Sequence, residues 1–451
     1  MQSKRRRREW LLTLVALPLG LFAAVQLGWF DELLPGRVEG RRQAVYSIAT
    51  YAALLWIATG VALLWRTRRT QIALAGLAAA AAVGGFEVYA RAVELPAGIP
   101  AIANMGMFSR AHHHRYPAGQ TLRLGTVGGE LLTLTTNEDG FRSGYGREAF
   151  LRHAPRIAIL GDSFPFGLGV RQGTEFPVLM ERILREETDN PELAVLNTGI
   201  VSYSPFLERW LYEDVVAAYE PDLVIVMIDV TDIGDDLRYE NESGARPGER
   251  PSFSLDLTEA EDFRDYGPTW TVLRPVRQWL QLPFLMVDLA LNGASSDEAR
   301  YYYYEFDLVI EGQRETNPFF FYRHPLEVTR PYFERTLRCV EDLADRVRED
   351  GARFAAVVIP RFQHWNPREC PENWESGSYA LEEPYQMEYF RFFREARERV
   401  DFPVLDLLPA FQATDEFPLV LRWDPHWNEA GHAFVARTLA DELLAAGLVT
   451  R

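Results

Sequence analysis

The chain has 451 residues, of which 47% are hydrophobic and 25% are charged, and this balance excludes an intrinsically disordered protein. Its formal net charge of -17 at pH 7 excludes the concentrated basic surface of a nucleic-acid-binding protein. The only cysteines, Cys339 and Cys370, exclude a disulfide-rich scaffold and a cysteine-rich metal site, and a single bond between them stays open if they lie outside the cytoplasm.

Three apolar runs in residues 1–93 predict a transmembrane anchor. Residues 10–30 and 44–65 contain no charged side chain and are long enough to cross a bilayer. The third run, 71–90, includes Glu87 and has a shorter uncharged part, so an anchor of two spans is the alternative to one of three. A cleaved signal peptide fits less well, because no clear small-x-small site follows the first run.

Loop charge predicts the orientation of this anchor. The basic clusters at 4–8 and 66–70 favour the cytoplasmic side, whereas the 31–43 loop has equal numbers of acidic and basic residues and suits the outside. Three spans then place everything after about residue 93 on the extracytoplasmic face, in the periplasm or at the cell surface, and two spans would keep it inside. We expect a multi-pass membrane protein whose soluble domain is extracytoplasmic, with the lipid bilayer as a partner.

After a linker and lead-in segment at 94–154, the chain alternates between short apolar runs and amphipathic stretches. Strands are predicted at 157–160, 193–196, 223–228, 354–359 and 403–406, and helices at 174–187, 206–219, 331–349, 385–399 and 428–446. This alternation predicts a three-layer α/β/α fold over 155–451, with a mainly parallel sheet of the flavodoxin-like kind. An insertion at about 240–330 breaks the rhythm, and we expect its aromatic clusters at 301–306 and 318–322 to serve packing.

The first predicted strand ends at Gly161-Asp162-Ser163, followed by Pro165. Ligands of parallel α/β sheets bind at the carboxyl ends of the strands, so Ser163 is placed where a nucleophile would act. The motif differs from the nucleophile elbow of α/β-hydrolases, which has glycine at the position of Pro165.

Near the other end of the chain, the segment "LRWDPHWNEAGH" at 421–432 contains Asp424 and His426. In an extended, proline-containing segment, side chains two residues apart point the same way, so the carboxylate can support the imidazole as a general base for a serine hydroxyl. His432 fits the first turn of the helix that follows rather than the role of a base.

Together these segments resemble a known family. "GDSFPFGLGV", "LNTGIVSYSP" at 196–205, "PDLVIVMIDVTDIGDD" at 221–236 and "DPHWNEAGH" are similar to the four sequence blocks of SGNH hydrolases, also called GDSL esterases or lipases. The wording "TNEDGFRS" at 136–143, the "PHWN" motif and the apolar amino terminus resemble the membrane-anchored branch. The resemblance covers about residues 130–451 without the insertion.

The resemblance implies that Ser163 is the nucleophile, His426 the base and Asp424 the acid that orients it. It also implies an oxyanion hole formed by the amide of Ser163, by Gly199 and by Thr231, and it implies no metal or other cofactor. The chain departs from the family at two positions. Thr231 stands where the family has asparagine, and the usual acid position, three residues before the histidine, is Trp423.

The sequence thus favours a membrane-anchored serine esterase or O-acyltransferase that acts through an acyl-enzyme on an extracytoplasmic glycan or lipid ester. The alternative is a catalytically silent SGNH-like domain that binds envelope polysaccharide or scaffolds a membrane complex, and the missing asparagine at Thr231 favours it. Substrate-binding residues stay open, although Arg361 and His364 follow a predicted strand and are expected at the same sheet edge.

Two further clusters have simpler interpretations. Adjacent side chains of His112, His113 and His114 cannot all face one ion in regular structure, so a polar loop is expected there. The acidic run at Asp229, Asp232, Asp235 and Asp236 lacks the glycine and terminal glutamate of a calcium loop, and a solvated loop at a strand end is expected.

Overall fold

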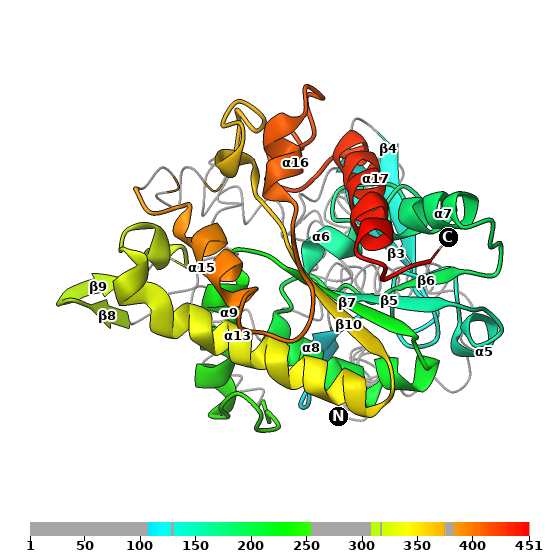
Figure 1. Ribbon diagram of the computed structural model, residues 1–451, viewed down its shortest axis with the longest axis horizontal. Coiled ribbons are helices and arrows are strands. Elements are labelled where there is room, and N and C mark those ends of the chain that lie inside the picture. The colour runs from blue at the N-terminus through cyan, green and yellow to red at the C-terminus, as the bar shows by residue number, and fades with distance from the viewer. Residues whose placement is uncertain are drawn as a thin grey trace, which may run out of the picture. The chain divides into compact units, whose positions relative to one another are not determined.

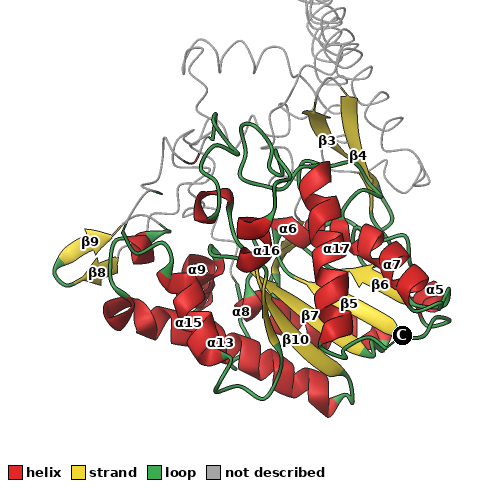
Figure 2. Ribbon diagram, turned by 45° about the horizontal axis from the view of Figure 1, so that its top comes forward, coloured by secondary structure: helices red, strands yellow, loops and turns green. Residues whose placement is uncertain are grey.

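The computed structural model describes residues 107–127, 130–253, 308–315, 318–373, 375, 381 and 384–450. Its central feature is a sheet of five parallel strands, shown in Figures 1 and 2. The strands are β5 (Arg156–Leu160), β6 (Ala194–Asn197), β7 (Leu223–Ile228), β10 (Arg353–Val358) and β11 (Val404–Asp406). Their spatial order is β11-β10-β7-β5-β6, so the direction of winding reverses between β5 and β7. That reversal is the switch point at which open parallel sheets bind ligands.

Both faces of the sheet are buried, and strand β7 shows this most clearly. All six of its residues are buried, with Leu223, Ile225 and Met227 in one hydrophobic cluster and the alternate residues in the other. The period-two alternation of a strand sends consecutive side chains to opposite faces. A continuous apolar run was therefore the correct signal for a strand covered on both sides.

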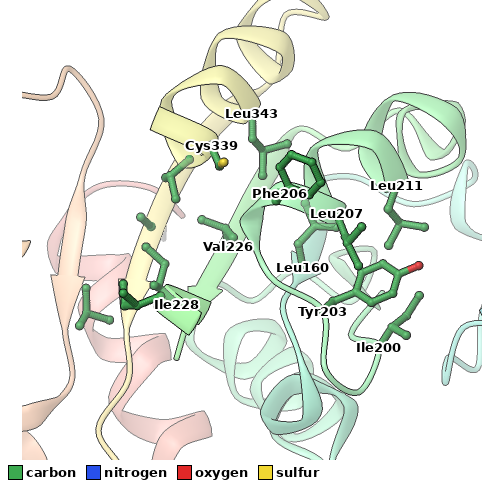
Figure 3. Packing of buried hydrophobic residues seen from close by; sticks show 14 of the residues in the cluster. Leu160, Ile200, Tyr203, Phe206, Leu207, Leu211, Val226, Ile228, Cys339 and Leu343 are labelled. Carbon is green, nitrogen blue, oxygen red and sulfur yellow. The ribbon is translucent and has the colours of Figure 1, made fainter. Parts of the chain in front are cut away.

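Helices cover the two faces. One face packs against α7 (Phe176–Glu187) and α17 (Glu429–Ala445), which also contact each other. The other packs against α8 (Pro205–Asp214), α13 (Leu326–Glu349) and α15 (Glu388–Ala396). Figure 3 shows Leu160, Val226 and Ile228 of the sheet in the same cluster as Phe206, Leu207 and Leu343 of these helices. The predicted three-layer α/β/α architecture is confirmed.

All five predicted strands and all five predicted helices are present, with ends shifted by a few residues. Helix α13 begins five residues before the predicted start. The predicted helix 206–219 is divided into α8 and the 3-10 turn η1 (Val216–Tyr219). Several further elements of the described residues were not predicted. They are the helices α5 (Arg147–Phe150), α6 (Ser163–Phe166), α9 (Asp232–Ser243) and α16 (Leu408–Ala413), and the 3-10 turns η3 (Phe320–Tyr322) and η4 (Phe362–His364).

Within the described ranges, three antiparallel strand pairs lie outside the central sheet. They are β1 (Met107–Ser109) with β2 (His113–Arg115), β3 (Thr121–Val127) with β4 (Glu130–Thr135), and β8 (Leu308–Ile310) with β9 (Gln313–Glu315). The aromatic cluster at 318–322 is buried against α13, so its expected packing role is confirmed, whereas 301–306 lies outside the described residues.

The three predicted membrane spans, 10–30, 44–65 and 71–90, also lie outside the described residues. Among the helices of the described part, none combines the length and the hydropathy needed to cross a bilayer.

A glycine in the first turn of α17 sets how closely that helix approaches the chain before it. A Cβ atom at Gly431 would lie 2.1 Å from the backbone oxygen of Leu419 and 2.9 Å from Cβ of Trp427. Replacing glycine by alanine ordinarily stabilises a helix by about 1 kcal/mol. At position 431 the clash with the backbone of Leu419 should make the same replacement destabilising.

We therefore expect Gly431→Ala to lower the free energy of unfolding by about 1–3 kcal/mol, measured by urea denaturation. Gly144→Ala is the control, since a Cβ at Gly144 would meet no atom within 4 Å. Equal stability of the Gly431→Ala variant and the wild type would contradict this packing.

Candidate functional site

The turn that carries Ser163 follows β5 directly. Gly161 has φ +147°, and a Cβ there would lie 2.6 Å from the Pro165 side chain and 3.0 Å from Met227. Asp162 then caps the single-turn helix α6 by accepting a hydrogen bond from the amide of Phe164 at 3.0 Å. Ser163 is thus the first residue of α6 at the carboxyl end of β5, and it is only 6% exposed.

A buried arginine from the lead-in segment fixes the far side of this turn. The Arg142 guanidinium donates to the carbonyl oxygens of Phe166, Gly167 and Val170 at 3.1, 2.6 and 2.9 Å. It also pairs with the Glu175 carboxylate at 3.2 Å, so the buried positive charge is compensated. The "TNEDGFRS" segment therefore contributes to the site by holding the turn after Ser163, a role that the sequence resemblance did not assign.

The loop before α17 is held by its own backbone. The amide of Leu421 donates to the carbonyl of His426 at 2.9 Å, and that of Asn428 donates to Leu419 at 3.0 Å. The side chain of Asn428 caps α17 by accepting from the amide of Gly431 at 2.9 Å. His426 consequently lies on a fixed loop at the strand ends. His432 lies in the first turn of α17, as expected, where its Nδ1 accepts from the amide of Phe176 at 3.2 Å.

The structure brings Ser163, His426 and Asp424 together. The hydroxyl of Ser163 lies 2.6 Å from Nε2 of His426. Nδ1 of His426 is hydrogen-bonded to Oδ1 of Asp424, which also accepts from the His426 backbone amide at 3.0 Å. Burial lowers the pKa of His426, but the Asp424 carboxylate raises it by more, so the pKa lies above its ordinary value. The acid position is thus filled two residues before the histidine, although Trp423 occupies the usual position.

A second carboxylate faces the Ser163 hydroxyl. Oδ2 of Asp162 lies 3.3 Å from Oγ of Ser163, so this hydroxyl has two acceptors within reach. Burial, followed by the charge of Asp229, raises the pKa of Asp162 to about 7. The shorter contact to His426 is the one with the geometry of a nucleophile and its base.

Two of the three predicted oxyanion donors, Gly199 and Thr231, already donate to other groups. The amide of Gly199 donates to Oδ1 of Asn197 at 3.0 Å, and the hydroxyl of Thr231 donates to Oδ2 of Asp229 at 2.6 Å. Glycine is needed at 199 because a Cβ would lie 2.5 Å from the amide nitrogen of Phe166. In this structure Gly199 therefore serves close packing on α6, and the geometry argues against Thr231 as a ready oxyanion donor. The amide of Ser163 stands at a helix amino terminus, where amides lack intrahelical acceptors.

An ion network lies beside this site, at the ends of β7 and β10. The Arg361 guanidinium donates to Asp229 at 2.8–3.2 Å and to Oε1 of Glu375 at 2.7 Å. Burial raises the pKa of Asp229, but Arg361 lowers it by more, so this carboxylate stays ionised. The backbone amide of Arg361 donates to Nδ1 of His364 at 3.0 Å. Arg361 and His364 thus lie at the predicted edge of the sheet, and both are buried.

The expectation of a solvated acidic loop is wrong, because α9 buries most of that segment. Asp232, Asp235, Asp236 and Glu240 follow the i, i+3, i+4 and i+8 spacing of one helix face, and all four are buried. The spacing of these acidic residues in the sequence already indicates a helix. Within the described residues, no group of three or more histidine, cysteine or acidic side chains could hold a metal ion.

The three adjacent histidines belong to a hairpin rather than to the predicted polar loop. His113 and His114 lie on β2, and His112 precedes them. His112 pairs with Asp214 at 2.9 Å, and Nε2 of His114 donates to the carbonyl of Val201 at 2.7 Å. Nε2 of His113 lies 3.2 Å from the Glu242 carboxylate, so each ring has its own partner. Cys339 and Cys370 are both free and buried, so the disulfide alternative is not formed.

Comparison with known proteins supports the resemblance at the coarse level. Residues 317–450 match the model of a family described as an SGNH hydrolase-like domain, acetyltransferase AlgX. The match is shorter than half of the chain and includes Asp424 and His426 but not Ser163. No curated protein matches the chain.

Several solved structures are partly similar to this chain. They include an alpha/beta hydrolase enzyme, LAE5, from the metagenome of Lake Arreo, Spain, at 15% identity over 67% of this chain and 99% of that one, with a TM-score of 0.34. The acetyl xylan esterase AlAXEase matches at 13% identity over 64% and 100%, with a TM-score of 0.32. A catalytic mutant of Axe2, an acetylxylan esterase from Geobacillus stearothermophilus, matches at 15% identity over 65% and 95%, with a TM-score of 0.32. The similarity to an SGNH hydrolase-like family rests on the match of residues 317–450, the carboxyl-terminal third of the chain.

A group of buried carboxyls near the site should make stability depend on pH. Glu208, in the first turn of α8, is fully buried, and neither of its oxygens has a hydrogen-bond partner within the described residues. Burial, followed by the charges of Asp162 and Asp236, raises its pKa well above the ordinary value. The folded state therefore keeps a proton that the unfolded state releases above about pH 4.

The folded state loses stability as pH rises from the pKa of Glu208 in the unfolded chain toward its higher pKa in the folded protein. Glu208→Gln removes this loss because the glutamine amide cannot ionise. We expect the variant's gain in free energy of unfolding to be small at about pH 4.5 and to grow by up to about 1.4 kcal/mol per pH unit above it. Urea denaturation at several pH values measures this, with the exposed Glu398→Gln as control. A gain that does not change with pH would contradict a protonated Glu208.

Proposed function

We propose that this protein is a membrane-anchored SGNH-type serine esterase or O-acyltransferase that acts through an acyl-enzyme. The observation that carries the proposal is the 2.6 Å contact between the Ser163 hydroxyl and Nε2 of His426, with Asp424 bonded to the opposite ring nitrogen. This arrangement suits a serine nucleophile, a general base and a carboxylate that fixes the imidazole tautomer. The match of residues 317–450 to an acetyltransferase-related family supports it.

The chemistry runs in two halves. Oγ of Ser163 attacks the ester carbonyl carbon while its proton passes to Nε2 of His426, and the Asp424 carboxylate stabilises the imidazolium that forms. The bond to the leaving alcohol then breaks, the alcohol takes the proton from His426, and the acyl group stays on Ser163. In the second half, water or a sugar hydroxyl gives its proton to His426 and attacks the acyl carbon, and the proton returns to Oγ of Ser163.

The second candidate is a catalytically silent domain that binds envelope polysaccharide or scaffolds a membrane complex. One observation favours it: the amide of Gly199 and the hydroxyl of Thr231 already donate to Asn197 and Asp229. Loss of one oxyanion donor costs roughly 10²–10³-fold in rate, so activity needs either the Ser163 amide or a rearrangement of these bonds.

The location and substrate class also belong to the proposal. The apolar runs and the basic loops of residues 1–93 support a multi-pass anchor with the catalytic domain outside the cytoplasm. A domain held there meets membrane lipids and envelope glycans, so the substrate proposed is an acylated glycan or lipid. The net charge of -17 makes nucleic acid an unsuitable partner.

Labelling of the full-length protein by a fluorophosphonate probe tests the proposed chemistry, because the probe reacts with activated serine hydroxyls. We expect the wild type to be labelled, Ser163→Ala to be unlabelled, and His426→Ala to react at least about 10²-fold more slowly. Ser202→Ala, which removes a different serine hydroxyl, is the control. Equal labelling of wild type and Ser163→Ala would contradict a nucleophilic Ser163, and an unlabelled, folded wild type would favour the silent domain.

The proposed topology predicts that Ser252→Cys is accessible from outside the cell. Ser252 is exposed, whereas the native Cys339 and Cys370 are buried, so the new thiol should dominate the signal. An impermeant maleimide should label this variant in intact cells. Labelling only after lysis would place the domain in the cytoplasm and rule out an extracytoplasmic substrate.

A further inference from the structure

We infer that Arg361 is a positioning residue for His426. Arg361 is a fixed positive charge that Asp229 and Glu375 hold beside the Phe164 ring, and the same ring packs against the imidazole of His426. The inference rests on the proposed serine chemistry and adds a residue that neither the sequence resemblance nor the predicted triad assigns. It concerns the protonation state of His426 rather than contact with substrate.

Arg361 is held with little freedom to move. Its guanidinium makes hydrogen bonds to both oxygens of Asp229 and one to Glu375, and its backbone amide is bonded to His364. Nε2 of His364 in turn lies 3.0 Å from the hydroxyl of Tyr322. Such bidentate geometry fixes the direction of an arginine.

One aromatic ring, that of Phe164, packs against both Arg361 and His426. The guanidinium carbon lies 5.7 Å from the centre of the Phe164 ring and 5.5 Å from that of Phe319. The centre of the His426 ring lies 5.0 Å from that of the same Phe164 ring. Arg361 is 4% exposed and Phe164 is 1% exposed, so bulk water does not screen the charge well. Charges interact over longer distances in such surroundings.

The charged groups packed against His426 and Arg361 are mainly acidic. Asp424 lies on its own loop, Asp162 at the end of β5, Asp229 at the end of β7 and Glu375 beyond β10. From α17, His432 has a pKa lowered to about 3, chiefly by burial, so it is uncharged near neutral pH.

The carboxylates of Asp424 and Asp162 raise the pKa of His426, whereas burial and the charge of Arg361 lower it. Arg361 therefore offsets part of the rise in the pKa of His426 and favours the neutral imidazole that a general base needs.

Two substitutions should act in opposite directions. Arg361→Gln removes the positive charge, so His426 holds its proton to higher pH. Asp229→Asn removes the main counter-charge of Arg361, so the positive charge acts more strongly and His426 loses its proton at lower pH. The double variant should return toward the wild type, because both charges are gone. A purely structural role predicts no such reversal of sign.

The experiment is a direct titration of His426 by NMR of the full-length protein, with the resonance assigned from His426→Gln. We expect a shift of about one pH unit upward in Arg361→Gln and a downward shift in Asp229→Asn. Arg361→Lys should restore most of the wild-type value. Arg209→Gln, which removes a cation paired with Asp342 and Glu213, is the matched control and should leave the titration unchanged.

The titration does not need turnover, so it separates this inference from the proposed function. Opposite shifts in the two single variants support the inference even if a fluorophosphonate probe fails to label Ser163. Shifts in the same direction, or none, overturn it even if labelling succeeds. If Arg361→Gln does not fold, Asp229→Asn and Arg361→Lys decide: a downward shift in the first and a near-wild-type value in the second support the inference, and any other pair of results overturns it.

Discussion

The proposed activity depends on one hydrogen bond, between the hydroxyl of Ser163 and Nε2 of His426, which joins residues 263 positions apart in sequence. Neither end could hold this geometry alone. Ser163 is fixed because the chain turns sharply at Gly161 and Asp162, at the end of β5. His426 is fixed because backbone hydrogen bonds within its loop hold that loop just before α17. The packing of α17 and α7 on the same face of the sheet then determines the distance between the two ends. A hydrophobic arrangement thus positions a polar contact that could not form from local structure.

The sequence predicted most of this architecture, because period-two and helical patterns report burial directly. Strand β7 is apolar along its whole length and is buried on both faces, and α17 follows a recognisable cap at Asn428. The sequence does not predict helix α9, because aspartate ordinarily faces solvent, although the spacing of these aspartates fits one helix face. The contribution of Arg142 could not be read from the sequence, since three of its four acceptors are backbone carbonyls, which carry no residue-type signal.

The candidate site was predicted unevenly for the same reason. Ser163, His426 and Asp424 meet as the family resemblance implies, because each stands beside a strand end or a helix cap that fixes it. Donors to an oxyanion are mainly amides, and their availability depends on bonds such as that from Gly199 to Asn197. Sequence blocks identify such positions but do not show which acceptor each donor takes. The ion network of Arg361, Asp229 and Glu375 is likewise a three-dimensional arrangement of segments far apart in the chain.

The proposed chemistry requires Ser163 to form a covalent acyl intermediate. The most direct measurement is mass spectrometry of the full-length protein, acid-quenched after brief exposure to an activated acetyl ester, followed by peptide mapping. We expect one added acetyl group, located on the peptide that contains Ser163, and its loss on longer incubation with water or a sugar acceptor. An unmodified Ser163 peptide, together with ester turnover or acetylation elsewhere, would contradict the account.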